Sequence, residues 1–456
     1  MAVSGFIRAF ILVFTLAVLG PQIAQAQIVD DESAAAAAQE NFRQEYELLQ
    51  PGDYRADDRF PGPSSPSDPD WYHLLRPGIR LRSRGSVRVI TPTVKLGVVF
   101  TGERGGYREG AQTLFAPAST TKIFTAALAL KELGSDFRFP TKFKWKAHFN
   151  GETSSTAAEL VVIGAGDFTL ETGSLADFIT QALKLAKASV VCGPLKIQAS
   201  DDRWNLPVIP SGWRYDDHAS LIPGALGFVR SANLNAGVKR RLDKAGIAWR
   251  GECEVPADAK AEEATRLSQP LREILKPFLE KSMNSVGEGL LRKVGEMKGD
   301  RTAPDLLSAG LPLLRDLAAS RVGKNEVTLN DGCGLSRTSR VSADALVNFL
   351  TELKSEPYFQ DFYAALPVAG RTGTLEHRMR KGAAKGRVHA KTGTLNRPMG
   401  AFQIAGYLEI PEEKGIRYQP FAILTSASSG LSGYCREMED QVLSRWSSLN
   451  QRGDSP

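Results

Sequence analysis

Three short polar motifs follow one another along this chain of 456 residues. They are Ser119-Thr120-Thr121-Lys122, Ser282-Met283-Asn284 and Lys391-Thr392-Gly393. Each motif alone is a weak signal, because residues of these types are common. In this order, and with their flanking sequences, they are typical of a Ser/Lys acyl-transfer enzyme that has no histidine in its machinery. Such a chain must fold so that three distant segments meet at one site.

The first motif opens a predicted buried helix. Pro117 stands just before it, at a place where helices tolerate proline. Apolar residues then recur at helical spacing, at Ile123, Ala126, Ala127, Leu130 and Leu133. Ser119 and Lys122 therefore share one face of the helix. A serine nucleophile needs a base, and a lysine can serve when burial and a nearby positive charge lower its pKa to about 7–8.

The second and third motifs supply polar groups that suit the same site. Ser282 offers a hydroxyl and Asn284 an amide, although a helix N-cap is the simpler structural explanation for such a tripeptide. The third motif lies on a predicted strand, where its glycine permits close approach of another backbone. A peptide can add to the edge of that strand, and the lysine and threonine can bind its terminal carboxylate. The charge of Lys391 also helps to keep Lys122 neutral.

The hydrophobic pattern predicts one sheet covered by helices. An apolar strand over 94–100 is followed by a turn and by a second strand that leads through Leu114 to Ala118. Apolar runs over 401–410 and 420–428 are joined by charged residues, which predicts an antiparallel hairpin. Helical patterns lie between these strands. The fold class that we expect is α+β, with an antiparallel sheet flanked by helices.

Residues 151–265, which have a different sequence pattern, separate the first two motifs. It contains short strands, frequent turns and a helical patch, so we predict an inserted, mainly β domain. Four cysteines allow three pairings, and an even count in an exported protein favours disulfides. We favour Cys192 with Cys253, because both lie in this segment, whereas Cys333 and Cys435 follow it.

The first 26 residues are typical of a secretory signal. Arg8 precedes an apolar stretch that is too short for a comfortable membrane span, and Ala24-Gln25-Ala26 is a small-x-small cleavage site. We expect cleavage near Ala26 and a periplasmic mature protein without a transmembrane anchor; an uncleaved anchor is the alternative. The expected division is signal peptide 1–26, low-complexity tail or linker 27–75, core 76–150, inserted domain 151–265 and core again 266–456.

Composition limits the other classes of function. The net charge of +6 is spread along the chain, which suits an anionic polymer, a membrane surface or merely a solvated exterior. The sequence contains no zinc-finger motif and no RNA-binding motif, so it gives no argument for nucleic-acid binding. The scattered histidines and the lack of a Cys-x-x-Cys pair argue against a metal, and no cofactor is expected.

Cys333, in a glycine turn over 330–336, is a poor candidate for a second nucleophile. Arg371-Thr372-Gly373-Thr374 resembles the third motif, and we assign it to a loop near the cleft; the alternative is that this segment, and not Lys391-Thr392-Gly393, is the real anchor.

The chain resembles the class C low-molecular-weight penicillin-binding proteins, a family of D-alanyl-D-alanine carboxypeptidases and endopeptidases. The resemblance extends from about Val94 to about Ser428. It rests on five stretches in the family's order: APASTTKIFTAALAL from Ala116, ELVVIGAGDFTL from Glu159, EKSMNSVGEGLLR from Glu280, NDGCGLSRTSRVS from Asn330 and HAKTGTLNRPMGAFQIAGYL from His389. It implies a core similar to β-lactamases and transpeptidases. Two positions depart from the family, which more often has aspartate where Met283 stands and serine where Cys333 stands.

The resemblance also implies roles for individual residues. Ser119 would be the nucleophile and Lys122 its base. Ser282 would relay a proton to the leaving group, and Asn284 would bind the substrate amide and hold Lys122. The backbone N–H groups of Ser119 and Thr394 would form the oxyanion hole. The substrate-binding residues are then Lys391, Thr392, Gly393 and Thr394.

The function that this resemblance implies is a serine-type D-Ala-D-Ala carboxypeptidase of peptidoglycan stem peptides, with D,D-endopeptidase action as a further activity. It would work through an acyl-enzyme, and β-lactams would acylate the same serine. Two alternatives remain: a β-lactamase or esterase on the same scaffold, and a catalytically weak wall-binding protein. The complete set of motif residues argues against the last. The sequence does not define the balance between the two peptidase activities.

Overall fold

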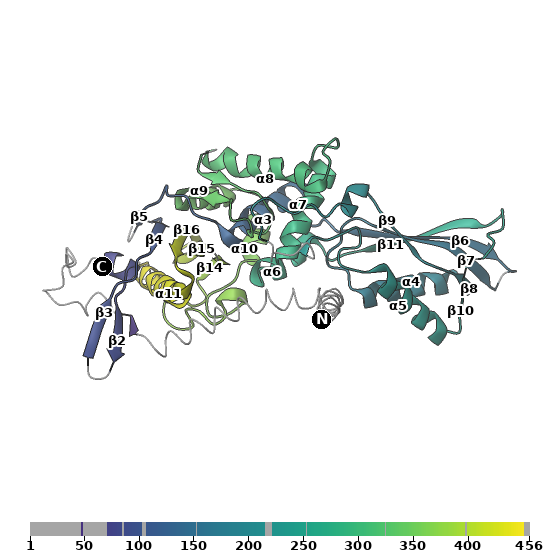
Figure 1. Cartoon of the computed structure of the whole chain (residues 1–456), viewed down its shortest axis with the longest axis horizontal. Helices are drawn as coiled ribbons and strands as arrows, with labels where there is room; N and C mark the ends of the chain where they lie inside the picture. Colours follow the sequence, from purple (N-terminus) through teal and green to yellow (C-terminus); the bar gives the residue numbers. More distant parts are fainter. Residues whose placement is uncertain are drawn as a thin grey trace, which may run out of the picture.

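The computed structural model describes residues 47–48, 71–83, 86–102, 106–151, 153–214, 221–251, 253–323, 325–396 and 399–450. The predicted signal peptide and most of the predicted tail lie outside the described residues. The described part divides into a core, which carries the three motifs, and an elongated domain at one end of it (Figure 1).

A five-stranded antiparallel sheet forms the centre of the core. Its strands, in spatial order, are β14 (Val388–Leu395), β15 (Gly400–Glu412), β16 (Gly415–Ala427), β4 (Lys95–Phe100) and β5 (Tyr107–Glu109). The predicted C-terminal hairpin is confirmed, and so is its union with the first strand in one sheet. The third motif lies on β14, an edge strand of this sheet.

The prediction of a second strand that leads through Leu114 to Ala118 is wrong. The strand that pairs with β4 is β5, and Phe115 forms an isolated bridge with Val341. Gly110 has a φ of 53° and its carbonyl accepts a hydrogen bond from Thr113 N at 2.9 Å. Glycine adopts such a φ without the strain that a Cβ brings, so the chain turns away from the sheet here. It therefore leaves the sheet before it reaches the serine motif.

Helices cover both faces of this sheet. On one side lie α3 (Thr121–Leu133), α6 (Leu271–Glu280), α7 (Asn284–Lys298), α8 (Leu306–Val322), α9 (Ala343–Leu353) and α10 (Phe359–Ala364). On the other lie α2 (Trp71–Leu75) and α11 (Ser432–Leu449). Side chains of β4 alternate between the two sides, with Val99 in the first core and Val98 and Phe100 in the second. Burial on both faces explains why this strand is an uninterrupted apolar run.

The helices α2 and α11 extend the core beyond what the sequence pattern predicts. Leu74 and Leu75 of α2 are buried in one cluster with Met438 and Trp446 of α11. The ring of Phe100 lies between the two helices, with its centroid 5.3 Å from that of Trp71 and 4.9 Å from that of Trp446. We therefore propose that the core begins near Trp71, inside the segment expected to be tail.

The inserted domain has its own sheet and hydrophobic core. Its strands run in the order β10 (Ala248–Arg250), β8 (Ala188–Cys192), β7 (Ser155–Gly164), β6 (Pro140–Phe149) and β11 (Lys260–Leu267), and β9 (Lys196–Ala199) also pairs with β7. Two helices, α4 (Thr172–Leu185) and α5 (Ser231–Lys244), pack together on this sheet (Figure 1). Because β6 pairs with β11 from Pro140 and Leu267 onward, we propose that the insert spans 140–267 and not 151–265.

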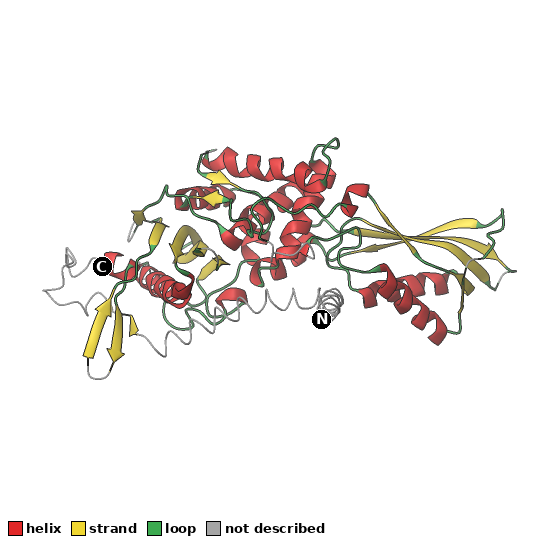
Figure 2. Cartoon of the chain, in the orientation of Figure 1, coloured by secondary structure: helices red, strands yellow, loops and turns green. Residues whose placement is uncertain are grey.

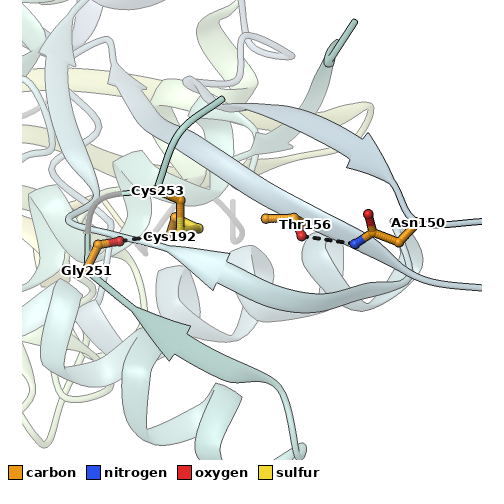
Figure 3. Close-up of a disulfide and its surroundings, with 5 residues drawn as sticks. All are labelled: Asn150, Thr156, Cys192, Gly251 and Cys253. Carbon is orange, nitrogen blue, oxygen red and sulfur yellow. Dashed lines mark hydrogen bonds between the residues drawn. A yellow bond between two sulfur atoms is a disulfide. The ribbon is translucent and has the colours of Figure 1, made fainter. Parts of the chain in front are cut away.

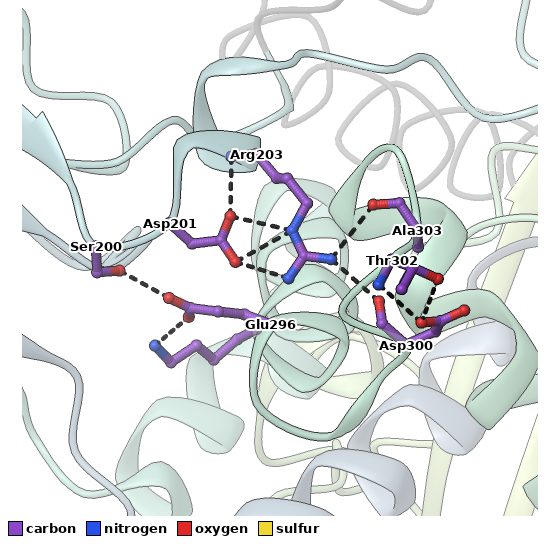
Figure 4. Close-up of polar contacts among 8 residues, drawn as sticks. Ser200, Asp201, Arg203, Glu296, Asp300, Thr302 and Ala303 are labelled. Carbon is purple, nitrogen blue, oxygen red and sulfur yellow. Dashed lines mark hydrogen bonds and ion pairs between the residues drawn. The ribbon is translucent and has the colours of Figure 1, made fainter.

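Polar contacts join the insert to the C-terminal end of α7 (Figure 4). Arg203, in the 3-10 turn η3 (Asp202–Asn205), forms an ion pair with Asp201 at 2.7 Å and donates to Asp300 O at 3.1 Å. Ser200 Oγ donates to Glu296 Oε1 at 2.7 Å. The contacts of Arg203 with Asp300 and of Ser200 with Glu296 are exposed, and exposed polar contacts contribute about 0–1 kcal/mol each.

Short elements complete the described part of the chain. The strands β1 (Glu47–Leu48), β2 (Ile79–Ser83) and β3 (Ser86–Ile90) form a small sheet, and β12 (Val327–Thr328) pairs with β13 (Arg340–Val341). Further 3-10 turns are η2 (Ala118–Thr120), η5 (Gly373–Leu375) and η6 (Ser429–Leu431). Figure 2 shows that most helices lie in the core, whereas long strands dominate the insert. Within the described residues, no helix has the length and apolar character needed to span a membrane.

Cys192 and Cys253 form a disulfide in the insert, which confirms the favoured pairing (Figure 3). Their Cα atoms are 5.8 Å apart, and the bond joins residues separated by 61 positions. Cys192 ends β8, and Cys253 follows β10, the parallel strand beside it. Cys333 and Cys435 are free and buried.

Replacement of both Cys192 and Cys253 by serine should lower the free energy of unfolding of the insert. The expected loss is about 2–4 kcal/mol, because a cross-link over a loop of this length restricts the unfolded chain. Urea unfolding followed by tryptophan fluorescence measures the change. Reduction of the wild type should reproduce the loss, and the double variant should be insensitive to reductant. Equal stability of the variant and the oxidised wild type would contradict this role.

Candidate active site

The first motif sits at a tight turn into a buried helix. The turn η2 holds Ser119, and α3 begins at Thr121. Thr120 Oγ1 donates to Pro117 O at 2.6 Å and closes this turn. Residues 120–130 are all buried, whereas Ser119 is partly exposed. The apolar run of α3 thus fixes the helix in the core and leaves the serine at its surface.

Lys122 is the centre of the site. Its side chain is fully buried, with 0% of the residue exposed. Its Nζ lies 2.8 Å from Ser119 Oγ, 2.7 Å from Asn284 Oδ1 and 2.7 Å from the carbonyl oxygen of Cys333. The structure therefore brings the first and second motifs into direct contact through this amine, together with the turn over 330–336.

The second motif lies at the junction of α6 and α7. Ser282 is 6% exposed and has a φ of 56°, which is uncommon for a residue with a Cβ. Met283 N donates to Phe278 O at 3.1 Å, and Asn284 is the first residue of α7. Two helices anchored in the main core hold this backbone in place. The side chain of Met283 packs against the same core, so the departure from the family's aspartate adds an apolar contact.

The third motif lies beside the serine turn. Lys391 Nζ donates to Thr392 O at 2.9 Å, and both residues are buried. A Cβ at Gly393 would lie 2.9 Å from Ser119 N and 3.0 Å from Pro117 O. The absence of a side chain therefore lets β14 approach the serine turn closely.

The segment 371–374 is a neighbour of the third motif. Thr392 Oγ1 donates to Thr374 Oγ1 at 2.7 Å, and Thr374 lies in η5, outside the strands. A Cβ at Gly373 would lie 2.5 Å from Glu280 O, so η5 packs against the end of α6. The prediction that this segment forms a loop is confirmed, and the loop lies beside the third motif.

The turn over 330–336 supplies the carbonyl that Lys122 contacts. The carboxylate of Asp331 is fully buried and accepts hydrogen bonds from Gly334 N at 2.9 Å, Ser336 N at 2.7 Å and Trp213 Nε1 at 2.8 Å. Gly334 has a φ of 89°, and a Cβ there would lie 1.8 Å from Ala118 O. Asp331 therefore shapes a turn that packs directly on the serine motif. Burial, with a smaller effect of the Glu288 charge, raises the pKa of Asp331 to about 6.

Glu288, Asp331 and Cys333 form a buried group whose side-chain ligand atoms lie within 4.8 Å of one another, close enough to hold a metal ion. Hydrogen bonds to other groups of the protein already engage these side chains. Glu288 accepts from Arg292 Nη1 at 2.5 Å and from Gly332 N at 2.8 Å. Burial raises the pKa of the Cys333 thiol well above its ordinary value, so the thiol stays protonated. We therefore interpret the group as hydrogen-bonded support for the turn, and this thiol is a poor nucleophile.

Sequence reasoning missed three contributors to the site. They are the hydroxyl of Thr374, the carbonyl of Cys333 and the guanidinium of Arg436, which donates from Nη2 to Thr394 Oγ1 at 2.9 Å. The glycines at 332 and 334 signalled a turn but not its contact with Lys122. No signal in the sequence pointed to Arg436, because only the packing of α11 on the sheet brings it to β14.

A serine beside a buried lysine, on an α+β core, is an arrangement typical of serine hydrolases. The chain belongs to the D-Ala-D-Ala carboxypeptidase 3 (S13) family, whose model matches residues 103–222 and 229–439. The match covers all three motifs and most of the insert. It agrees with the resemblance seen in the sequence.

Individual relatives support this family membership. The chain is 28% identical over 427 residues to a D-alanyl-D-alanine carboxypeptidase of Actinomadura sp. (strain R39), covering 72% of this chain and 76% of the relative. It is 26% identical over 357 residues to carboxypeptidase DacB of Mycolicibacterium smegmatis, covering 70% and 73%. A crystal structure of penicillin binding protein 4 from Haemophilus influenzae matches with a TM-score of 0.60 at 18% identity, covering 77% of this chain and 96% of that one. The last match shows the fold, and the expected α+β transpeptidase-like core is confirmed.

Asp331→Asn should change how stability depends on pH. The folded protein takes up the Asp331 proton at about pH 6, above the ordinary value of 3.8, so the folded state binds this proton more tightly than the unfolded chain. The resulting contribution to stability is fully present below about pH 4 and is lost as the pH rises through about 6. The stability of the wild type relative to the variant should therefore fall between these pH values in urea unfolding.

The control for the loss of a carboxylate as such is Asp316→Asn, at an exposed position of α8. A wild-type advantage over Asp331→Asn that stays constant, or grows as the pH rises, would contradict the raised pKa.

Proposed function

We propose that this protein is a serine-type D-Ala-D-Ala carboxypeptidase that cleaves peptidoglycan stem peptides through an acyl-enzyme on Ser119. The observation that carries the proposal is the buried Nζ of Lys122, 2.8 Å from Ser119 Oγ and 2.7 Å from Asn284 Oδ1. A base must lie within hydrogen-bond reach of the proton that it abstracts, and this contact meets that condition.

Acylation begins when neutral Lys122 takes the hydroxyl proton of Ser119 along this contact. Ser119 Oγ then forms a bond with the carbonyl carbon of the penultimate D-Ala. The C–N bond to the terminal D-Ala breaks, and the leaving nitrogen gains a proton that Ser282 relays from Lys122. The start of α3 favours the negative charge that develops on the serine oxygen. The products of this step are free D-Ala and an ester on Ser119.

The oxyanion of the tetrahedral intermediate needs two preorganised donors. We assign them to the backbone N–H groups of Ser119 and Thr394. Gly393 supports this assignment, because a Cβ at that position would lie 2.9 Å from Ser119 N. The glycine thus keeps the strand next to the serine turn, so that N–H groups from both can converge on one oxygen.

The substrate is proposed to lie along the edge strand β14 as an added strand. Lys391, Thr392 and Thr394 then bind its terminal carboxylate with charge-assisted hydrogen bonds, and Asn284 binds the peptide amide. Deacylation reverses the proton path: Lys122 takes a proton from water, the water oxygen attacks the ester carbon, and Ser119 regains its proton. β-Lactams, whose ring amide mimics the D-Ala-D-Ala bond, should acylate the same oxygen.

We also propose that the protein works in the periplasm. The predicted signal peptide, with cleavage near Ala26, supports export. The disulfide between Cys192 and Cys253 supports it independently, because such bonds persist in oxidising compartments. Sequencing the N-terminus of the exported protein tests the cleavage site.

Intact-mass spectrometry with benzylpenicillin tests the nucleophile and the base. The wild type should carry one persistent adduct, and Ser119→Ala should carry none. Lys122→Met should slow acylation by about 10²- to 10⁴-fold, because it removes the general base. Lys131→Met is the matched control: it lies on the same helix α3 with 49% of its side chain exposed, and it should acylate at the wild-type rate.

Each other outcome has a distinct meaning. An adduct on Ser119→Ala would place the nucleophile elsewhere. Rapid turnover of penicillin without a persistent adduct would favour a β-lactamase. A folded wild type that is neither labelled nor able to cleave D-Ala-D-Ala peptides would favour the wall-binding alternative.

A further inference from the structure

Arg436 connects the C-terminal helix to the third motif. It is 7% exposed, and its Nη2 donates to Thr394 Oγ1 at 2.9 Å. On β14, Thr392 and Thr394 are two positions apart and therefore share one face of the strand. Both hydroxyls belong to the group that the proposed function assigns to the substrate carboxylate. The guanidinium thus lies one hydroxyl away from that carboxylate.

The direction of this hydrogen bond determines what Thr394 can do. A guanidinium has only donors, so Thr394 Oγ1 is the acceptor and its own hydrogen must point elsewhere. Thr394 is partly exposed. Its hydroxyl is therefore set to donate toward an acceptor outside the strand. The hydroxyl of Thr392, in contrast, donates to Thr374 Oγ1 at 2.7 Å, so it must rotate away from Thr374 before it can donate to the carboxylate.

A network of buried charges lies beside Arg436 and contacts its backbone. Arg378 donates from Nη2 to the carbonyl of Arg436 at 3.3 Å, and it forms ion pairs with Glu439 and Asp440, each at 2.8 Å. All four residues are buried, and the positive charges of Arg378 and Arg436 both act on Glu439. A preset donor needs no reorganisation when an anion binds. Burial also strengthens the field of Arg436 at the hydroxyl that it contacts.

We propose that Arg436 is a positioning residue that fixes the Thr394 hydroxyl as a donor to the substrate carboxylate and thereby selects peptides that end in a free carboxylate. This inference rests on the proposed function. It adds a specificity determinant that lies outside the three motifs, on α11. A neutral C-terminal carboxamide gains little from the charge of Arg436. The site should therefore prefer a peptide with a free C-terminal carboxylate over the same peptide with a C-terminal carboxamide.

The test compares cleavage of a synthetic peptide ending in D-Ala-D-Ala with cleavage of the same peptide as its C-terminal carboxamide. The wild type should prefer the acid in kcat/KM. Arg436→Met should lower kcat/KM for the acid by about 10- to 100-fold, the effect of losing a hydrogen bond to a charged group. It should lower kcat/KM for the carboxamide by less than about 3-fold. Arg436→Lys, which keeps the charge, should recover part of the preference.

A double-mutant cycle with Thr394→Val separates positioning from general damage. Thr394→Val removes the hydroxyl and leaves α11 untouched. If Arg436 acts through that hydroxyl, adding Arg436→Met to Thr394→Val should cause no further loss of the acid preference. Thermal unfolding of each variant measures whether it is folded. If Arg436→Met fails to fold, Arg436→Lys and Thr394→Val carry the comparison.

Two kinetic outcomes would overturn the inference: equal losses on acid and carboxamide, which indicate a structural role, or an unchanged preference in Arg436→Met. Acylation by benzylpenicillin and by its methyl ester gives the same comparison without peptide turnover. If penicillin does not label Ser119 and neither peptide is cleaved, the proposed function itself fails. That result is distinct from a labelled enzyme whose preference does not depend on Arg436.

Discussion

The site depends on one buried amine. Lys122 has no exposed surface, and burying an unpaired polar group costs several kcal/mol. Three hydrogen-bond partners offset this cost: Ser119 Oγ, Asn284 Oδ1 and the carbonyl of Cys333. They come from segments far apart in the sequence, so the amine is satisfied only when η2, α7 and the turn over 330–336 are all in their native positions. The contact between Ser119 and Lys122 therefore forms only when the core has assembled correctly.

Much of the fold was accessible from local patterns. Helix α3, the hairpin of β15 and β16, the insert and the disulfide all have strong signals over short stretches: helical apolar spacing, paired apolar runs, a change in texture and two cysteines in one segment. The second strand was misplaced because Phe115 is apolar in a region that leads out of the sheet. Its burial, at 3% exposed, comes from packing and not from strand pairing in the central sheet.

The site residues that the sequence did not predict were missed for one physical reason. Helix α11 buries Arg436, Glu439 and Asp440 as well as apolar residues, so its sequence does not show a clean apolar face. A buried charge network becomes visible only when its partners, such as Arg378, are in place. The motif residues could be named in advance because their chemistry is carried by side-chain type. Their supports act through tertiary contacts, and a backbone carbonyl such as that of Cys333 has no signature in a sequence at all.

The antiparallel pairing of β6 with β11 has a consequence for how such a protein can change over evolutionary time. Pro140 lies opposite Leu267, so the two ends of the insert are about 5 Å apart, one strand spacing. Because the two ends of the insert are adjacent, the insert affects the core in the same way as a longer surface loop would. Closing a longer loop costs little extra entropy. The insert can therefore grow, shrink or be exchanged while the order of the core elements, and with it the set of contacts around Lys122, stays the same.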